Sequence, residues 1–170
     1  MKLLLVTALL FCFVNANCQQ AANSIETSNI HIINGLKQSY SFGPANQLQQ
    51  AFGKTKAIKE ADEVRGGFGY TYKYKGLTVD FHEHDWDSAT VSGTEYAVVL
   101  NNIPYKIGEN ISKLKNAFPL SFKHPEKRSA NNSVVWIDIT NKKKPIDAFI
   151  HISFDNKGSI TEIWIGNNDS

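Results

Sequence analysis

Cysteine is nearly absent from this chain. The 170 residues include two cysteines, Cys12 and Cys18, and both lie close to the N-terminus. No disulfide can therefore join two segments beyond residue 18, so the fold must be stabilised by a hydrophobic core. Beyond the first residues, no apolar stretch approaches the ~20 residues that a bilayer-crossing helix needs. We therefore expect the rest of the chain to be soluble.

The chain also lacks a strong charge of either sign and the common catalytic motifs. Its 18 basic and 16 acidic residues give a formal net charge of +2, which gives no electrostatic case for binding nucleic acid or an anionic membrane surface. There is no Gly-x-Ser-x-Gly motif and no phosphate-binding glycine loop before a helix. The glycine-rich residues 66–69 precede a strand pattern instead. The sequence predicts no cofactor.

The N-terminus has the features of a signal peptide. Lys2 is followed by apolar residues 3–14 and then by small and polar residues. We expect a signal peptide over residues 1–18, cleaved after Ala16 or Cys18, and hence a secreted or periplasmic bacterial protein. Lipidation of Cys18 is an alternative, although the preceding Asn15 and Asn17 depart from the usual lipoprotein signal. Residues 19–29 are polar and aperiodic and predict a flexible leader.

Two later segments, residues 40–53 and 105–119, share a pattern of aromatic and aliphatic residues. The corresponding pairs are Tyr40 with Tyr105, Leu48 with Leu114 and Phe52 with Phe118. In each segment the leucine and phenylalanine are four residues apart, so they lie on one helical face. Each pattern stops at a helix-breaking residue, Gly53 or Pro119. The spacing predicts two short helices and an internal duplication.

Alternating apolar residues predict strands after each helix. The first set covers residues 68–75, 77–81 and 94–100, and the second covers 134–139, 148–154 and 159–165. We therefore expect an α+β protein of two tandem units, residues 30–101 and 102–170. Each unit would be a short helix packed on a three- to four-stranded antiparallel sheet.

This arrangement resembles the β-lactamase-inhibitor-protein-like fold over residues 32–165. The shared feature is a tandem of units, each of which opens with a glycine-led helix, ends that helix in an apolar-Gly-x-Pro step and continues into an antiparallel meander. The small lipoprotein of the outer-membrane protein assembly machine resembles a single such unit. The chain departs from the pattern because Gly53 is not followed by proline, Pro119 is not preceded by glycine, and the paired cysteines of inhibitor members are missing. The resemblance implies a non-enzymatic protein that binds another protein through a sheet face.

The strands of the second unit predict two different faces. Ile137, Ile150 and Ile163 fall on the predicted core face, and the opposite face is unusually rich in aromatic residues. The candidate partner-binding residues on that face are Trp136, Phe149, His151 and Trp164. A row of tyrosines, Tyr70, Tyr72 and Tyr74, would extend the same surface if it lies on the same side. The alternative is that the face is covered by the other unit, the leader or a second copy.

Residues 80–87 are the segment whose residue types are most typical of a metal-binding or catalytic site. On a strand, Asp80, His82 and His84 point in one direction, and Glu83 could act as a general base above a bound ion. A metal-binding protein or metal-dependent hydrolase is therefore the alternative function. The same alternation also fits the polar face of a half-exposed strand.

We therefore expect an exported, non-enzymatic protein-binding module that uses the aromatic face. The identity of its partner and its oligomeric state stay open.

Overall fold

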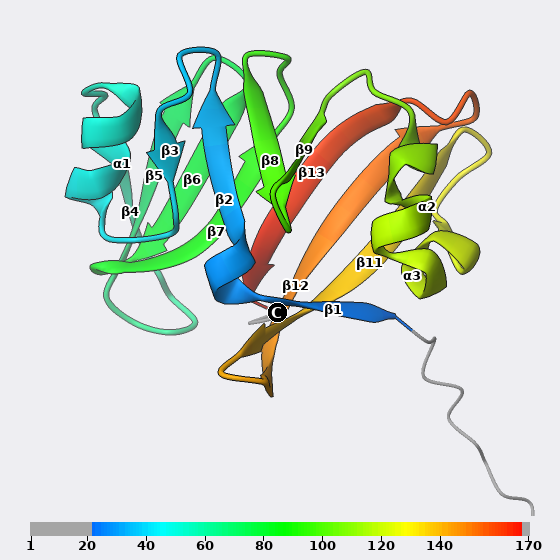
Figure 1. Cartoon of the computed structure of the whole chain (residues 1–170). Helices are drawn as coiled ribbons and strands as arrows, with labels where there is room; N and C mark the ends of the chain where they lie inside the picture. The colour runs from blue at the N-terminus through cyan, green and yellow to red at the C-terminus, as the bar shows by residue number, and fades with distance from the viewer. Residues whose placement is uncertain (1–21, 168–170) are drawn as a thin grey trace, which may run out of the picture.

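The computed structural model describes residues 22–167, which form two β-sheets and a few short helices (Figure 1). The larger sheet, sheet A, has the strand order β1-β11-β12-β13-β7-β6-β5-β4, and β10 also pairs with β11. Its strands are β1 (Asn23–Glu26), β4 (Ile58–Ala61), β5 (Phe68–Tyr74), β6 (Leu77–His82), β7 (Asp85–Val91), β10 (Glu126–Lys127), β11 (Asn132–Asn141), β12 (Lys144–Asp155) and β13 (Ile160–Asn167).

The smaller sheet, sheet B, has the order β3-β2-β8-β9. Its strands are β2 (Ile30–Asn34), β3 (Ser39–Tyr40), β8 (Tyr96–Leu100) and β9 (Ile103–Lys106). The helices are α1 (Ala45–Phe52), α2 (Leu114–Ala117) and α3 (Pro119–Lys123), with 3₁₀ turns η1 (Thr27–Asn29) and η2 (Ile111–Lys113). None of the helices within residues 22–167 is long and apolar enough to cross a membrane. The expected α+β class is confirmed.

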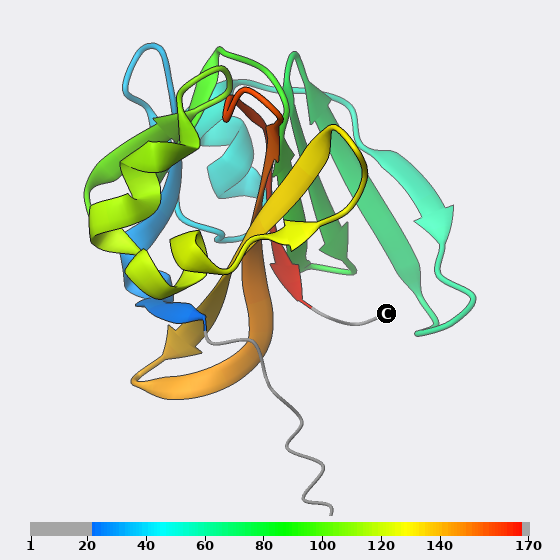
Figure 2. The ribbon, with the colours of Figure 1, turned by 90° about the vertical axis from the view of Figure 1, so that its right-hand side faces the viewer.

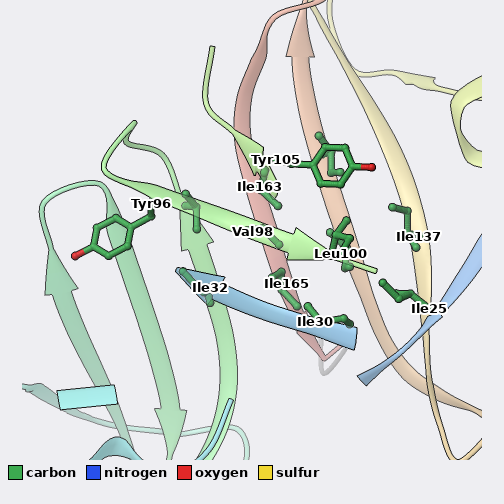
Figure 3. Packing of buried hydrophobic residues seen from close by; sticks show 14 of the residues in the cluster. Ile25, Ile30, Ile32, Tyr96, Val98, Leu100, Tyr105, Ile137, Ile163 and Ile165 are labelled. Carbon is green, nitrogen blue, oxygen red and sulfur yellow. The ribbon is translucent and has the colours of Figure 1, made fainter. Parts of the chain in front are cut away.

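Sheet B and the helices lie on one side of sheet A, and the core fills the space between them (Figures 1 and 2). Figure 3 shows Ile32, Val98 and Leu100 of sheet B close to Ile163 and Ile165 of sheet A. These side chains are all fully buried. Because side chains alternate across a strand, Trp164, which lies between Ile163 and Ile165, points to the opposite side of sheet A. Its cross-strand neighbours, His151 on β12 and Trp136 on β11, point to that side too.

The helix periodicity was a good guide to the buried residues but not to the length of the second helix. Leu48 is fully buried on α1, and the chain leaves this helix at Gly53 with φ 93°. The second segment is interrupted: η2 runs directly into α2, and α2 is capped by Phe118, whose φ of −136° is not helical. Pro119 then begins α3. Proline suits the first turn of a helix because its missing N–H has no intrahelical partner there.

The strand that follows β6 in sheet A differs from the prediction. The segment at residues 94–100 was expected to be the third strand of the first unit, but it forms β8 of sheet B. The actual neighbour of β6 is β7, reached through a tight turn in which Glu83 has φ 54°. The polar, histidine-rich character of residues 82–87 obscured both the turn and the start of β7.

The predicted leader is wrong for residues 23–29. Asn23 to Glu26 form β1, which pairs in parallel with β11, and η1 follows it. Ile25 is buried with 3% of its surface exposed, and the Asn23 backbone N–H donates to Ser121 Oγ at 2.8 Å. A single buried isoleucine and pairing with a distant strand are enough to order this segment. The predicted signal peptide, including Cys18, and residues 19–21 lie outside the described residues.

Candidate functional site

A single row of side chains crosses sheet A on the side that faces away from sheet B. The strand register places these residues opposite one another in the order Trp136, His151, Trp164, Thr90, Thr78 and Lys73. Direct cross-strand neighbours share a face of the sheet. We call this side of sheet A the outer face. The residues of this row are aromatic on β11, β12 and β13 and polar on β7, β6 and β5.

The aromatic cluster consists of Trp136, Phe149, His151 and Trp164, and the structure brings all four predicted residues into contact. The Trp136 and His151 ring centroids are 3.5 Å apart, and those of Phe149 and Trp164 are 5.2 Å apart. His151 also stacks on Phe149, with centroids 4.6 Å apart and planes 23° apart. All four side chains are half-buried, so each keeps part of its surface accessible to solvent.

Neighbouring residues hold the two indoles in place. Trp136 Nε1 donates a hydrogen bond to Glu126 Oε2 at 2.9 Å, and Glu126 is paired with Arg128 at 3.1 Å. The Arg128 guanidinium lies 5.4 Å from the Trp136 ring centroid, within cation–π range. Trp164 folds over Gly166, where an added Cβ would lie 2.5 Å from the indole Cζ2. The cluster is therefore preorganised.

His151 lies in a markedly apolar environment for an ionisable group. Its Nε2 is buried and has no hydrogen-bond partner among the described residues. Burial, and secondarily the positive charge of Arg128, lower the pKa of His151 from 6.5 to about 4. The imidazole is therefore neutral at neutral pH and acts as an aromatic member of the cluster.

Two hollows flank the aromatic cluster. One, with a volume of about 450 Å³, lies beside Trp164 and is lined in part by Asp62, Arg65 and Asp87. The other, of about 550 Å³, lies beside Phe149 and is lined in part by Asp138 and Asp147. The outer face thus has an aromatic centre and polar, indented sides.

The tyrosine row does not extend this surface. Tyr70, Tyr72 and Tyr74 pair with Phe81, Val79 and Leu77 of β6, and those three partners are buried on the core side. Tyr74 donates from its hydroxyl to the Gly53 carbonyl at 3.0 Å, next to α1. The expectation of one continuous aromatic surface is therefore wrong. The pairing of β5 with β6 turns the tyrosines toward the core side instead, where Tyr70 and Tyr72 line a groove of about 390 Å³.

The candidate metal ligands are also separated. Strand β6 ends at His82, and His84 lies exposed in the following turn and lines the groove on the core side. Asp80 accepts hydrogen bonds from Thr71 at 2.6 Å and Ser88 at 3.1 Å.

His82 Nε2 lies 2.8 Å from the Gly66 carbonyl, and the expected base, Glu83, accepts from the Phe68 N–H at 2.8 Å. Within residues 22–167 no three His, Cys, Asp or Glu side chains form a group that could hold a metal ion. The predicted common face for Asp80, His82 and His84 is wrong, because the turn falls between the two histidines.

Sequence reasoning missed the residues that support the outer face. Glu126 belongs to the two-residue strand β10 and Arg128 follows it, in a segment with no apolar alternation, and only tertiary structure brings Glu126 to Trp136. Arg65 bridges Asp62 and Asp87 with contacts of 2.9 Å to each, from a loop that carries no recognisable motif. Gly166, two residues after Trp164, was the one available signal of a close approach within the strand.

Comparisons with known proteins find two solved structures that resemble this chain at low sequence identity and low TM-score. No protein-family model and no curated protein matches it. An extracellular protein containing a SCP domain from Bacillus anthracis str. Ames shares 18% identity with a TM-score of 0.44, over 80% of this chain and 44% of that one. This chain therefore spans less than half of that protein.

A Streptococcus mutans protein described as a putative beta-lactamase inhibitor protein shares 15% identity with a TM-score of 0.28, over 81% of this chain and 90% of that one. The expected resemblance to this kind of fold is confirmed as a weak similarity.

Proposed function

We propose that this chain is an exported, non-enzymatic protein-binding module whose contact surface is the aromatic cluster. The observation that carries this proposal is the composition of the row across the outer face. Trp136, His151 and Trp164 occupy the same row as Thr90, Thr78 and Lys73. The polar half of the row lies on the same sheet and over the same continuous core, so aromatic residues are not required there to form the sheet.

The chemistry of the cluster fits protein recognition. Tryptophan is among the residue types that contribute most to protein–protein binding, because it offers a large apolar area together with a polar N–H. The Glu126 hydrogen bond and the packing over Gly166 fix the indoles before any partner arrives. Side chains that are already ordered lose less conformational entropy on binding, which favours affinity.

We also propose that the chain contains two tandem units, as the sequence pattern suggests. The order of elements supports this: the hairpin β2–β3, then α1, then strands β4 to β7, is followed by the hairpin β8–β9, then α2 and α3, then strands β10 to β13. Tyr40 and Tyr105 are buried near the ends of the two hairpins, and Leu48 and Leu114 on the two helices. The expected boundary at residues 101–102 falls in the turn of the β8–β9 hairpin, so the topology favours a boundary between β7 and β8.

Export is proposed from the sequence of residues 1–18, with its basic residue and apolar run. Mass spectrometry of the native N-terminus tests it. A free terminus near residue 17 or 19 supports cleavage by signal peptidase, and diacylation of Cys18 supports a lipid anchor. An intact Met1 contradicts export.

The binding proposal is tested by affinity capture from the medium and envelope of the producing cell. The bait is the exported protein, compared with its Trp136→Ala/Trp164→Ala variant. Thr78→Ala/Thr90→Ala provides a matched control, because it alters the polar half of the same row. We expect a protein that is retained by the wild type and the control and lost from the tryptophan variant.

Far-ultraviolet circular dichroism and urea unfolding separate a lost contact from a lost fold. A folded tryptophan variant that retains the same proteins as the wild type contradicts the proposal. A variant that unfolds shows instead that the indoles act mainly in stability, and Trp136→Phe/Trp164→Phe then replaces it as the bait.

A further inference from the structure

We propose that the partner presents a basic surface around an apolar centre, and this inference rests on the proposed function of the aromatic cluster. The basis is a set of carboxylates that lies beside Phe149 and Trp164 on the outer face. We call Asp138, Asp147 and Glu162 the acidic rim. All three side chains are exposed to solvent.

The strand register places the acidic rim next to the aromatic rings. Asp138 lies directly opposite Phe149 on the neighbouring strand. Asp147 precedes Phe149 by two residues on β12, and Glu162 precedes Trp164 by two residues on β13. Alternation places Asp138 and Glu162 on the side of the cluster. Asp147 lies in an irregular stretch of β12 between Pro145 and Phe149, and it lines the same hollow as Asp138 and Phe149. The rim and the cluster therefore form one surface.

The acidic rim is not neutralised by the protein itself. Within residues 22–167, no ion pair involves Asp138, Asp147 or Glu162. The nearby arginines are already engaged, because Arg128 pairs with Glu126 at 3.1 Å and Arg65 with Asp62 and Asp87.

Among the residues that line the two described hollows beside the cluster, one is a lysine. Lys143 lines the hollow that contains Asp138 and Asp147. The residues that line the two hollows, together with Glu162, carry five carboxylates (Asp62, Asp87, Asp138, Asp147 and Glu162) against Arg65 and Lys143. This lining is net negative, although Lys142 and Lys144 flank Lys143 in the sequence and the whole chain has a formal charge of +2.

This charge distribution determines which partners the surface favours. Nucleic acids and anionic lipid surfaces would be repelled, because like charges across an interface are costly. A partner with Lys or Arg around an apolar anchor would be steered toward the cluster and would pair with the rim after docking. Apolar contact then supplies affinity, and the rim supplies selectivity and association rate.

The test uses a random peptide library displayed on phage and selected against the exported protein. Peptides that also bind the Trp136→Ala/Trp164→Ala variant are removed. We expect the remaining sequences to combine aromatic or aliphatic residues with Lys or Arg. Enrichment of acidic or uncharged sequences overturns the basic partner but leaves the binding function standing. The absence of any tryptophan-dependent sequence overturns the proposed function and this inference with it.

Charge-neutralising variants test the acidic rim directly with the selected peptide. Asp138→Asn/Glu162→Gln keeps the side-chain shapes and removes two charges, and we expect affinity to fall roughly 2- to 30-fold, since exposed ion pairs each contribute little. The effect should shrink between about 0.01 M and 0.15 M salt, because the screening length falls from about 30 Å to about 8 Å. Glu60→Gln is the matched control: it is exposed on β4 at the other edge of sheet A. Equal affinities for the rim variant, the control and the wild type overturn the inference.

Discussion

His151 makes the stability of this protein depend on pH in a specific window. Its pKa is lowered from 6.5 to about 4 by burial among the rings of the aromatic cluster. The unfolded chain has an ordinary histidine and therefore binds more protons than the folded protein between these two values. The free energy of unfolding must then fall as pH drops from about 6.5 to about 4, and this contribution is fully present above pH 6.5.

The size of the effect follows from the same two values. Each pKa unit corresponds to about 1.4 kcal/mol, so lowering the pKa from 6.5 to about 4 contributes at most about 3.5 kcal/mol. Between pH 7 and pH 4.5 the loss is at most about 2.5 kcal/mol. Because the ring is half-buried and water screens part of the effect, we expect the free energy of unfolding to fall by about 1–2 kcal/mol between pH 7 and pH 4.5.

The assay is urea unfolding of the wild type and of His151→Phe at pH 7 and pH 4.5. Phenylalanine keeps an aromatic ring but cannot take up a proton. Carboxylates that titrate in this range affect both proteins equally, so the difference between the two pH dependences isolates His151. His84→Gln, in an exposed turn, is the control and should behave as the wild type. If His151→Phe loses as much stability on acidification as the wild type does, the buried, neutral imidazole is not the cause.

Three further predictions concern packing. Gly166→Ala should lower the free energy of unfolding by about 1–3 kcal/mol and change tryptophan fluorescence, because the added Cβ would lie 2.5 Å from the Trp164 ring. Gly35→Ala is the control and should do neither, because nothing lies within 4 Å of its added Cβ. Equal unfolding midpoints for the two variants would refute the close approach. Deletion through residue 26 removes β1 with its buried Ile25, so it should lower the free energy of unfolding by at least about 2 kcal/mol, measured by thermal or urea unfolding. Deletion through residue 21 leaves β1 in place and is the control. Equal stabilities of the two truncated proteins would mean that β1 does not contribute to the fold. Leu48→Ala should lower the free energy of unfolding by about 2–5 kcal/mol, because Leu48 is fully buried. Leu36 is 80% exposed, so Leu36→Ala should lower it by about 0.5 kcal/mol or less. Similar losses for the two variants would mean that α1 does not pack against the core as described.

Sequence reasoning succeeded where the signal was local. Alternation over residues 134–139 correctly separated buried Ile137 from half-exposed Trp136, because side-chain direction in a strand depends only on position along that strand. The four-residue spacing in α1 and its stop at Gly53 were found for the same reason. It failed at β1, whose order comes from pairing with a strand more than a hundred residues away. It also failed at His84, where one turn separates residues that alternation alone would have placed together.

The amino-acid sequence by itself therefore determined the α+β class, most of the strands and the composition of the aromatic face. These properties follow from periodicity and residue type. Only the tertiary structure decided which strands share a sheet, and so which rings share a surface. Cross-strand register joined Trp136, His151 and Trp164 in one row and turned Tyr70, Tyr72 and Tyr74 toward the core side. The pKa of His151 was likewise beyond the sequence, because desolvation depends on every neighbour that folding brings to the ring.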